Sequence, residues 1–160
     1  MYDVFLTKGC RHQPSLEGVE QQFPELIDLN VAKRATGAHP GFLGFDLDNK
    51  HIIHQLMGTL RMAGAQGEIV FSKYRNAQST LKIDEAMVIA EENLRKEQNE
   101  HLDLTYGKIR LIEEGIMWFQ FASPVKEWRQ QGYIPGAYSI FVDKLDGHIW
   151  QDEEFDLLLR

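Results

Sequence analysis

Residues 115–150 read GIMWFQFASPVKEWRQQGYIPGAYSIFVDKLDGHIW, and this stretch decides the fold. Nearly all side chains at positions 116–121 are apolar. Because successive side chains of a strand point to opposite faces, both faces of this strand would be apolar, which is typical of a strand at the centre of a sheet. A second β-rich run covers 138–142, and the sequence LDG at 145–147 predicts a tight hairpin that leads into 148–150. No reactive group in this stretch has an obvious chemical purpose, so we interpret it as a recognition scaffold.

The segment before this stretch predicts a helix followed by a half-exposed strand. The helical pattern covers 83–96, with charged residues off its apolar stripe, and the strand pattern covers 104–113. The apolar stripe consists of Ile83, Met87, Ala90 and Leu94. We therefore expect an α+β fold, in which a helix packs on an antiparallel sheet of about four strands.

The N-terminal half has a mixed α/β pattern that supplies one or two strands. A polar segment at 74–80 is the candidate linker, so the chain divides into a region 1–78 and a region 79–160, or forms one continuous domain. The expected elements are strands at 2–7 and 68–72, helices at 16–22 and 25–35, and a further helix capped by Asp46 or Asp48. One face of that further helix consists of Leu47, Ile52 or Ile53, Leu56 and Leu60.

The composition indicates a globular, acidic protein. Its 24 acidic side chains against 17 basic ones give a formal charge of −7, which argues against nucleic-acid binding and is compatible with a basic protein partner. Cys10 is the only cysteine, so no intrachain disulfide can form. The chain shows no secretory signal, and no stretch approaches the roughly 20 apolar residues of a membrane span. These features predict a cytoplasmic protein.

Three groups of residues are candidates for a reactive site, and each has a simpler interpretation. His51 and His54 could face one metal ion, but the sequence supplies no further ligands at a zinc-site spacing. Residues 46–50 begin like a calcium loop, but a helix cap explains them better. Cys10 beside two cationic or titratable neighbours could be an activated thiol, although an inert cysteine is more frequent. We therefore expect a protein without enzyme activity, metal or cofactor.

The polar feature that points to function is the acidic run near the C-terminus. The run comprises Asp152, Glu153, Glu154 and Asp156, and Asp146 adds a further carboxylate shortly before it. Like charges repel one another, so a cationic partner could favour such a cluster, and a solvated tail is an equally good explanation. Trp128 and Tyr133 are aromatic residues of the kind that concentrates at binding hot spots, although core packing also explains them.

The second half of the chain resembles the YrhB-like family, one of the immunity-protein families of bacterial polymorphic toxin systems. The resemblance begins with an Ala-containing helix at 84–94 and continues with a Gly–aromatic strand at 115–121. It is strongest at 136–149, GAYSIFVDKLDGHI, and covers residues 82–155. It implies a small protein that protects its own cell by binding a cognate toxin.

The functional hypothesis that follows is neutralisation of a toxin by stoichiometric binding. The acidic residues would attract and pair with a basic surface of the toxin, for which a nuclease is one candidate, while Trp128 and Tyr133 would anchor the complex. The alternative is a small chaperone-like protein that binds exposed apolar segments, a role also suggested for the family. A metal- or thiol-dependent enzyme is the least favoured hypothesis.

Overall fold

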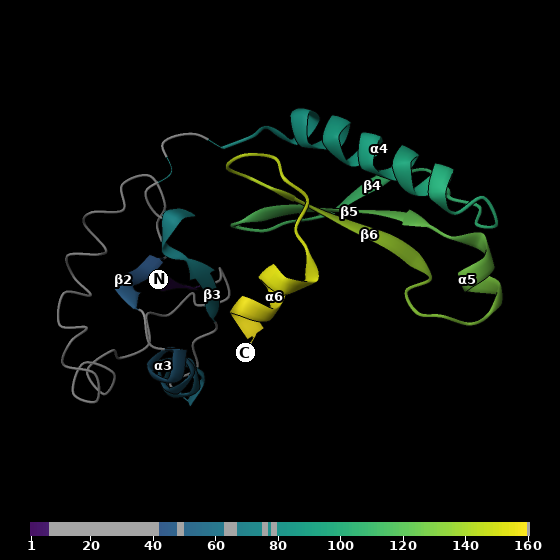
Figure 1. The fold of residues 1–160 in the computed structure, drawn as a ribbon. Coiled ribbons are helices and arrows are strands. Elements are labelled where there is room, and N and C mark those ends of the chain that lie inside the picture. Colours follow the sequence, from purple (N-terminus) through teal and green to yellow (C-terminus); the bar gives the residue numbers. More distant parts are fainter. Residues whose placement is uncertain (7–41, 48–49, 63–66, 75–76, 78–79, 160) are drawn as a thin grey trace. The chain divides into compact units, whose positions relative to one another are not determined.

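The chain forms two compact units, residues Met1–Ala77 and Gln78–Leu159, in a computed structural model (Figure 1). Each unit contains one three-stranded antiparallel sheet and at least one helix, which confirms the expected α+β class. The residues that the structure describes are 1–6, 42–47, 50–62, 67–74, 77 and 80–159. The expected helices at 16–22 and 25–35 lie outside them.

The sheet of the first unit has the strand order β2-β1-β3. Its strands are β1 (Tyr2–Leu6), β2 (Phe42–Leu47) and β3 (Gly67–Phe71), and the helix α3 (Lys50–Met62) and a short 3-10 helix, η2 (Ser72–Tyr74), complete the unit. Ile53 and Leu56 of α3 are buried, as are Val4 and Val70 of the sheet. The sequence predicted one or two strands here. It missed β2, because this short run is interrupted by Gly44, a residue that is depleted in strands.

The sheet of the second unit has the strand order β4-β5-β6, with β5 in the middle. The strands are β4 (Arg110–Glu114), β5 (Trp118–Pro124) and β6 (Ala137–Asp143), and Phe121 lies opposite Ile140. The prediction of a central strand is therefore confirmed for residues 118–121, whereas residues 116 and 117 form a bend before β5. The expected strand at 104–113 is shorter than predicted and begins only at Arg110.

Helix α4 (Ile83–Glu100) covers one face of this sheet (Figure 1). Its buried side chains are Ala86, Ala90 and Leu94, and they join the sheet residues Ile109, Phe119, Phe121, Ile140 and Val142 in one core. The small alanine side chains leave room for the large aromatic ones, as dense packing requires. Ile83, the first residue of the predicted stripe and of the helix, is 38% exposed, whereas Ala90 and Leu94 are buried.

The expected fourth strand does not form. The chain turns after β6, and residues 148–150 then make a single bridge between Ile149 and Val142. Two backbone hydrogen bonds support it, from Asp143 N to His148 O at 2.9 Å and from Trp150 N to Phe141 O at 2.9 Å. The chain then leaves the edge of the sheet, because helix α6 (Asp152–Leu159) begins two residues after Trp150.

Two further helices occupy segments for which the sequence predicted none. Helix α5 (Lys126–Gln130) lies in the connector between β5 and β6, and α6 contains the acidic run. In Figure 1, α6 lies on the face of the sheet opposite α4, and α5 lies at one end of the sheet. Phe155 attaches α6 to this face, with ring centroids 4.8 Å from Phe141 and 5.6 Å from Trp118.

Candidate partner-binding surface

The residues predicted to bind a partner lie at the two opposite ends of β6. Trp128 and Tyr133 precede its first residue, whereas the acidic residues follow its last. The acidic residues are Asp146, Asp152, Glu153, Glu154 and Asp156. Because a strand rises by about 3.3 Å per residue, seven residues separate the two groups by about 20 Å. The predicted residues therefore form two sites and not one.

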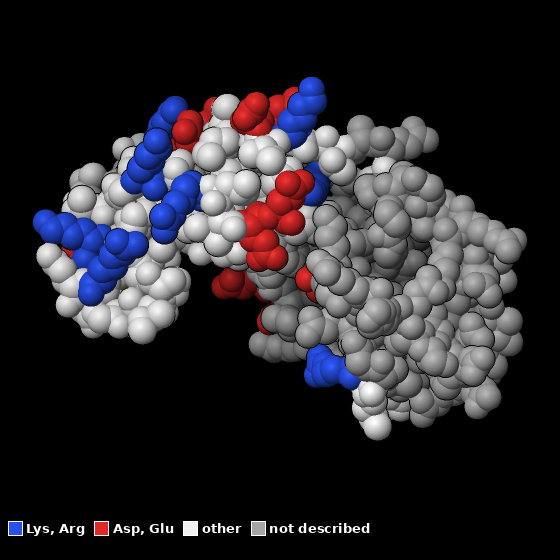
Figure 2. Space-filling view, turned by 180° about the vertical axis from the view of Figure 1, so that it is seen from behind, with Lys and Arg blue, Asp and Glu red and all other residues white. Residues whose placement is uncertain are grey.

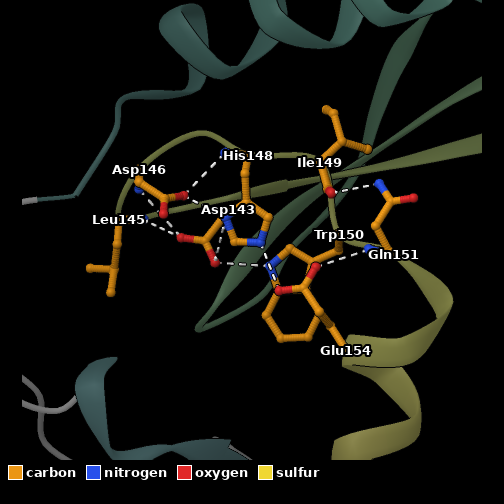
Figure 3. A network of polar contacts seen from close by, with 8 residues as sticks. All are labelled: Asp143, Leu145, Asp146, His148, Ile149, Trp150, Gln151 and Glu154. Atoms are coloured by element: carbon orange, nitrogen blue, oxygen red, sulfur yellow. Dashed lines mark hydrogen bonds and ion pairs between the residues drawn. The ribbon is translucent and has the colours of Figure 1, made fainter.

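At the acidic end, His148 contacts two carboxylates (Figure 3). Its Nδ1 lies 2.5 Å from Asp146 Oδ1, and its Nε2 lies 2.8 Å from Glu154 Oε1. Since carboxylate oxygens only accept hydrogen bonds, both ring nitrogens must donate, which requires the imidazolium form. Partial burial alone lowers the pKa of His148, but the hydrogen bonds to Asp146 and Glu154 and the charge of Asp143 outweigh burial and raise it above 6.5.

Asp143 organises the turn that presents His148. Its carboxylate is fully buried, and Oδ1 accepts a hydrogen bond from Leu145 N at 2.7 Å. Its Oδ2 accepts a second one from Trp150 Nε1 at 2.9 Å (Figure 3). These bonds connect the two sides of the turn, which explains an acidic residue at a fully buried position. Both Asp143 and His148 lie in the stretch 136–149 that carries the family resemblance, but the sequence analysis did not single them out as site residues.

The acidic run lies in helix α6, and its first three residues belong to the first turn of that helix. Asp152, Glu153 and Glu154 all lie in that turn, where the helix dipole favours negative charge. Glu154 Oε2 also accepts a hydrogen bond from Gln151 N at 3.0 Å, as a residue of a capping box does. Asp152, Glu153 and Asp156 are exposed, and Glu154 is half-buried. The acidic run therefore has a structural explanation that requires no partner.

One group of described residues has the side chains and spacing of a metal site. The ligand atoms of Asp143, Asp146 and His148 lie within 4.8 Å of one another. The same atoms already form the hydrogen bonds of the turn, so an ion would have to displace those bonds. His51 and His54 are both exposed on α3, and His51 contacts Gln55 at 3.1 Å.

Two other candidates from the sequence have no described site around them. Cys10 lies outside the described residues. Of the calcium-like segment, Asp46 belongs to β2, Asp48 and Asn49 lie outside the described residues, and α3 begins at Lys50.

At the other end of the sheet, hydrogen bonds to Thr105 hold α5. The Glu127 carboxylate accepts hydrogen bonds from Thr105 N at 2.7 Å and from Thr105 Oγ1 at 2.8 Å. Lys126 N donates to Thr105 O at 3.0 Å. The backbone hydrogen bond from Thr105, followed by the one from its side chain, lowers the pKa of Glu127 below 4.5. The short helix is therefore fixed to the segment that precedes β4.

The loop between α5 and β6 is held at its base and exposed at its tip. Tyr133 N donates to Trp128 O at 3.0 Å, and Val125 N donates to Gly136 O at 3.0 Å. Gly136 has a φ of +61°, a conformation that side chains disfavour. Tyr133, Ile134 and Pro135 are exposed, and Ile134 retains 96% of its accessible surface. Trp128 is half-buried and supports the loop from α5.

Exposed cations lie on α5 and on the segment that precedes β4. Lys126 and Arg129 belong to α5, and Lys108 follows Gly107, whose N donates to Pro124 O at 2.7 Å. Figure 2 shows blue side chains gathered at the end of the unit that carries α5. We call this the α5 surface, and it consists of Lys108, Lys126, Arg129, Tyr133, Ile134 and Pro135. Sequence reasoning found only Tyr133 of this set.

Comparison with protein-family models, with curated proteins and with solved structures found no match. Among the described residues, no helix has the length and apolar character needed to cross a membrane.

Proposed function

We propose that the protein acts in the cytoplasm as an immunity protein that binds and neutralises a cognate bacterial toxin. The observation that carries the binding role is the exposed apolar tip of the α5 surface. Three consecutive residues, Tyr133 to Pro135, expose apolar side chains to solvent. Aromatic and large apolar residues on an exposed loop are suited to anchoring another protein.

The choice of a toxin as the partner comes from the family resemblance. The resemblance covers residues 82–155, nearly the same range as the second unit, Gln78–Leu159. Both the α5 surface and the sheet that supports it lie within this range. Stoichiometric binding that covers a functional surface of the toxin, with a nuclease as one candidate, needs no catalytic residue in this chain.

The construction of the loop favours tight binding. Ordering a flexible loop on association costs about 0.5–1.5 kcal/mol for each immobilised side chain, and a loop that is already held costs less. The bonds at Tyr133 and Val125 hold both ends of this loop. We therefore expect the loop to enter the complex without rearrangement.

The test uses the product of the gene beside that of this protein, which the proposal expects to be a toxin. The wild-type chain should form an equimolar complex with the toxin and abolish its activity. Ile134→Asp should weaken binding about tenfold or more, because it places a charge in the apolar contact. Val88→Asp is the matched control, since Val88 is exposed on α4, and it should bind like the wild type.

Two results would contradict the proposal. If the wild-type chain and the toxin do not associate, the immunity role is wrong. If Ile134→Asp and Val88→Asp bind equally well, the partner does not contact the loop.

A chaperone-like role is the second candidate, because exposed apolar side chains also occur elsewhere. Leu102 is 86% exposed and Ile112 is 49% exposed, on a loop and on β4. A chaperone would suppress the aggregation of a heat-unfolded reporter enzyme, and Ile134→Asp would reduce that activity only partly. An immunity protein would leave the aggregation unchanged.

A further inference from the structure

We propose that the α5 surface docks onto an acidic protein surface that contains an apolar pocket. This inference rests on the proposed function and adds the chemistry of the partner. It differs from the expectation of a basic partner, which depended on the acidic run. That run lies at the other end of β6 and forms the start of α6.

The cations of the α5 surface are available for a partner. Lys108, Lys126 and Arg129 are exposed, and none forms an ion pair with another residue in the described part of the chain. The carboxylate of this helix, Glu127, instead bonds to Thr105. A partner with carboxylates at matching positions would therefore gain charge complementarity without breaking an existing pair.

The loop that carries the apolar residues lies next to one of these cations, Arg129. Building a Cβ on Gly136 would bring it within 2.7 Å of Arg129 Cγ, so the stem of Arg129 lies over the base of the loop. Ile134 is at the tip of the same loop and is almost fully exposed. A complementary partner thus needs a pocket for Ile134 with carboxylates at its rim, which is the usual arrangement of an apolar centre and a polar edge.

The excess of acidic side chains in the rest of the unit does not cancel the preference of the α5 surface for an acidic partner. Residues 78–159 contain sixteen acidic and eight basic side chains, so the unit is acidic as a whole. However, the Debye length at physiological salt is about 8 Å, and the acidic residues of α6 lie about 20 Å along β6 from the α5 surface. Glu127 is the carboxylate on α5 itself, and it accepts two hydrogen bonds from Thr105. The exposed cations of α5, Lys126 and Arg129, therefore favour a negatively charged partner at contact.

A nucleic acid fits these observations less well than a protein. Nucleic-acid affinity depends on many phosphate contacts, about six to ten in a typical complex, whereas the α5 surface offers three cations. Phosphate contacts also leave no role for an exposed isoleucine. Binding of the α5 surface to a single-stranded DNA oligonucleotide is therefore an outcome that would overturn the inference.

The experiment reverses the charge of the α5 surface and measures the dissociation constant for the toxin encoded by the neighbouring gene. Lys126→Glu/Arg129→Glu should weaken binding about tenfold at about 50 mM salt, and the difference should shrink at about 500 mM salt. Arg95→Glu/Lys96→Glu is the matched control, because it reverses two exposed cations on α4. This control should bind within about twofold of the wild type. Circular dichroism should show that all variants remain folded.

Tighter binding by Lys126→Glu/Arg129→Glu would show that the partner surface is basic. If Ile134→Asp still weakened binding in that case, the proposed function would stand and this inference alone would fail. Equal effects of the α5 and α4 charge reversals would also overturn the inference. No binding by the wild-type chain would overturn both proposals.

Discussion

His148 lies between two carboxylates, and its charge therefore decides how strongly the turn after β6 is attached to α6. Asp146 comes from the turn and Glu154 from the helix, so the imidazolium connects two segments that the backbone places side by side. Asp143 adds a third negative charge, 3.9 Å from Nδ1. Loss of the proton would remove one donor and leave a carboxylate facing a neutral nitrogen lone pair.

We predict that the second unit becomes less stable as the pH rises through the folded-state pKa of His148. Folding raises this pKa above 6.5, so the stabilisation is fully present below about pH 6.5 and is lost at higher pH. Urea unfolding between about pH 6 and about pH 9, followed by tryptophan fluorescence, measures the change. All three tryptophans, Trp118, Trp128 and Trp150, lie in this unit.

The control compares two histidine variants. His148→Gln should remove the pH-dependent loss, whereas His101→Gln, at the C-terminal end of α4, should retain it. A wild-type stability that stays constant or increases over this range would show that His148 does not connect the turn to α6.

At the scale of elements, helix α6 depends on the sheet for its position. It is eight residues long, and an isolated helix of this length is not stable in water. Three aromatic contacts attach it, because the Phe155 ring lies against Trp118, Phe141 and Trp150. The contact of Glu154 with His148 adds a polar attachment at the first turn.

Phe155→Ala should therefore lower the free energy of unfolding by about 2 kcal/mol, less than for a fully buried phenylalanine because this side chain is half-buried. The tryptophan emission should shift towards longer wavelength as Trp150 and Trp118 gain contact with water. Leu157→Ala is the control in the same helix, since Leu157 is 51% exposed, and it should cost less than about 0.5 kcal/mol. Equal losses for the two variants would mean that α6 is not held by its aromatic contact.

At the scale of the whole molecule, the charge is divided unequally between the two units. Residues 1–77 contain eight acidic and eight basic side chains, whereas residues 78–159 carry the excess of acidic ones. The second unit also has its own core, formed by α4 and the sheet β4-β5-β6. All residues of the α5 surface belong to this unit.

We predict that residues 78–159 fold by themselves and bind the neighbouring toxin with the affinity of the whole chain. The contact residues and the elements that position them all lie within this fragment. Isothermal titration calorimetry of the fragment and of the whole chain measures the two affinities. A folded fragment that binds more than about tenfold more weakly would show that the first unit contributes to the interface.

The sequence by itself determined the class of the fold and the position of its central strand. Phe119 and Phe121 are apolar because β5 has α4 on one face, and Trp118 is apolar because Phe155 lies on the other. The stripe of α4 could also be predicted, since helical periodicity is local, although Ile83 at the start of the helix is partly exposed.

Only the tertiary structure decided which polar and apolar side chains have partners. Glu127 binds a residue 22 positions away, and Glu154 binds a histidine across a turn, so both carboxylates are explained by contacts that no local pattern contains. Ile134 remains exposed because the bonds at the base of its loop point the tip away from the core. Burial and pairing depend on residues distant in sequence, and for that physical reason the α5 surface was visible only in three dimensions.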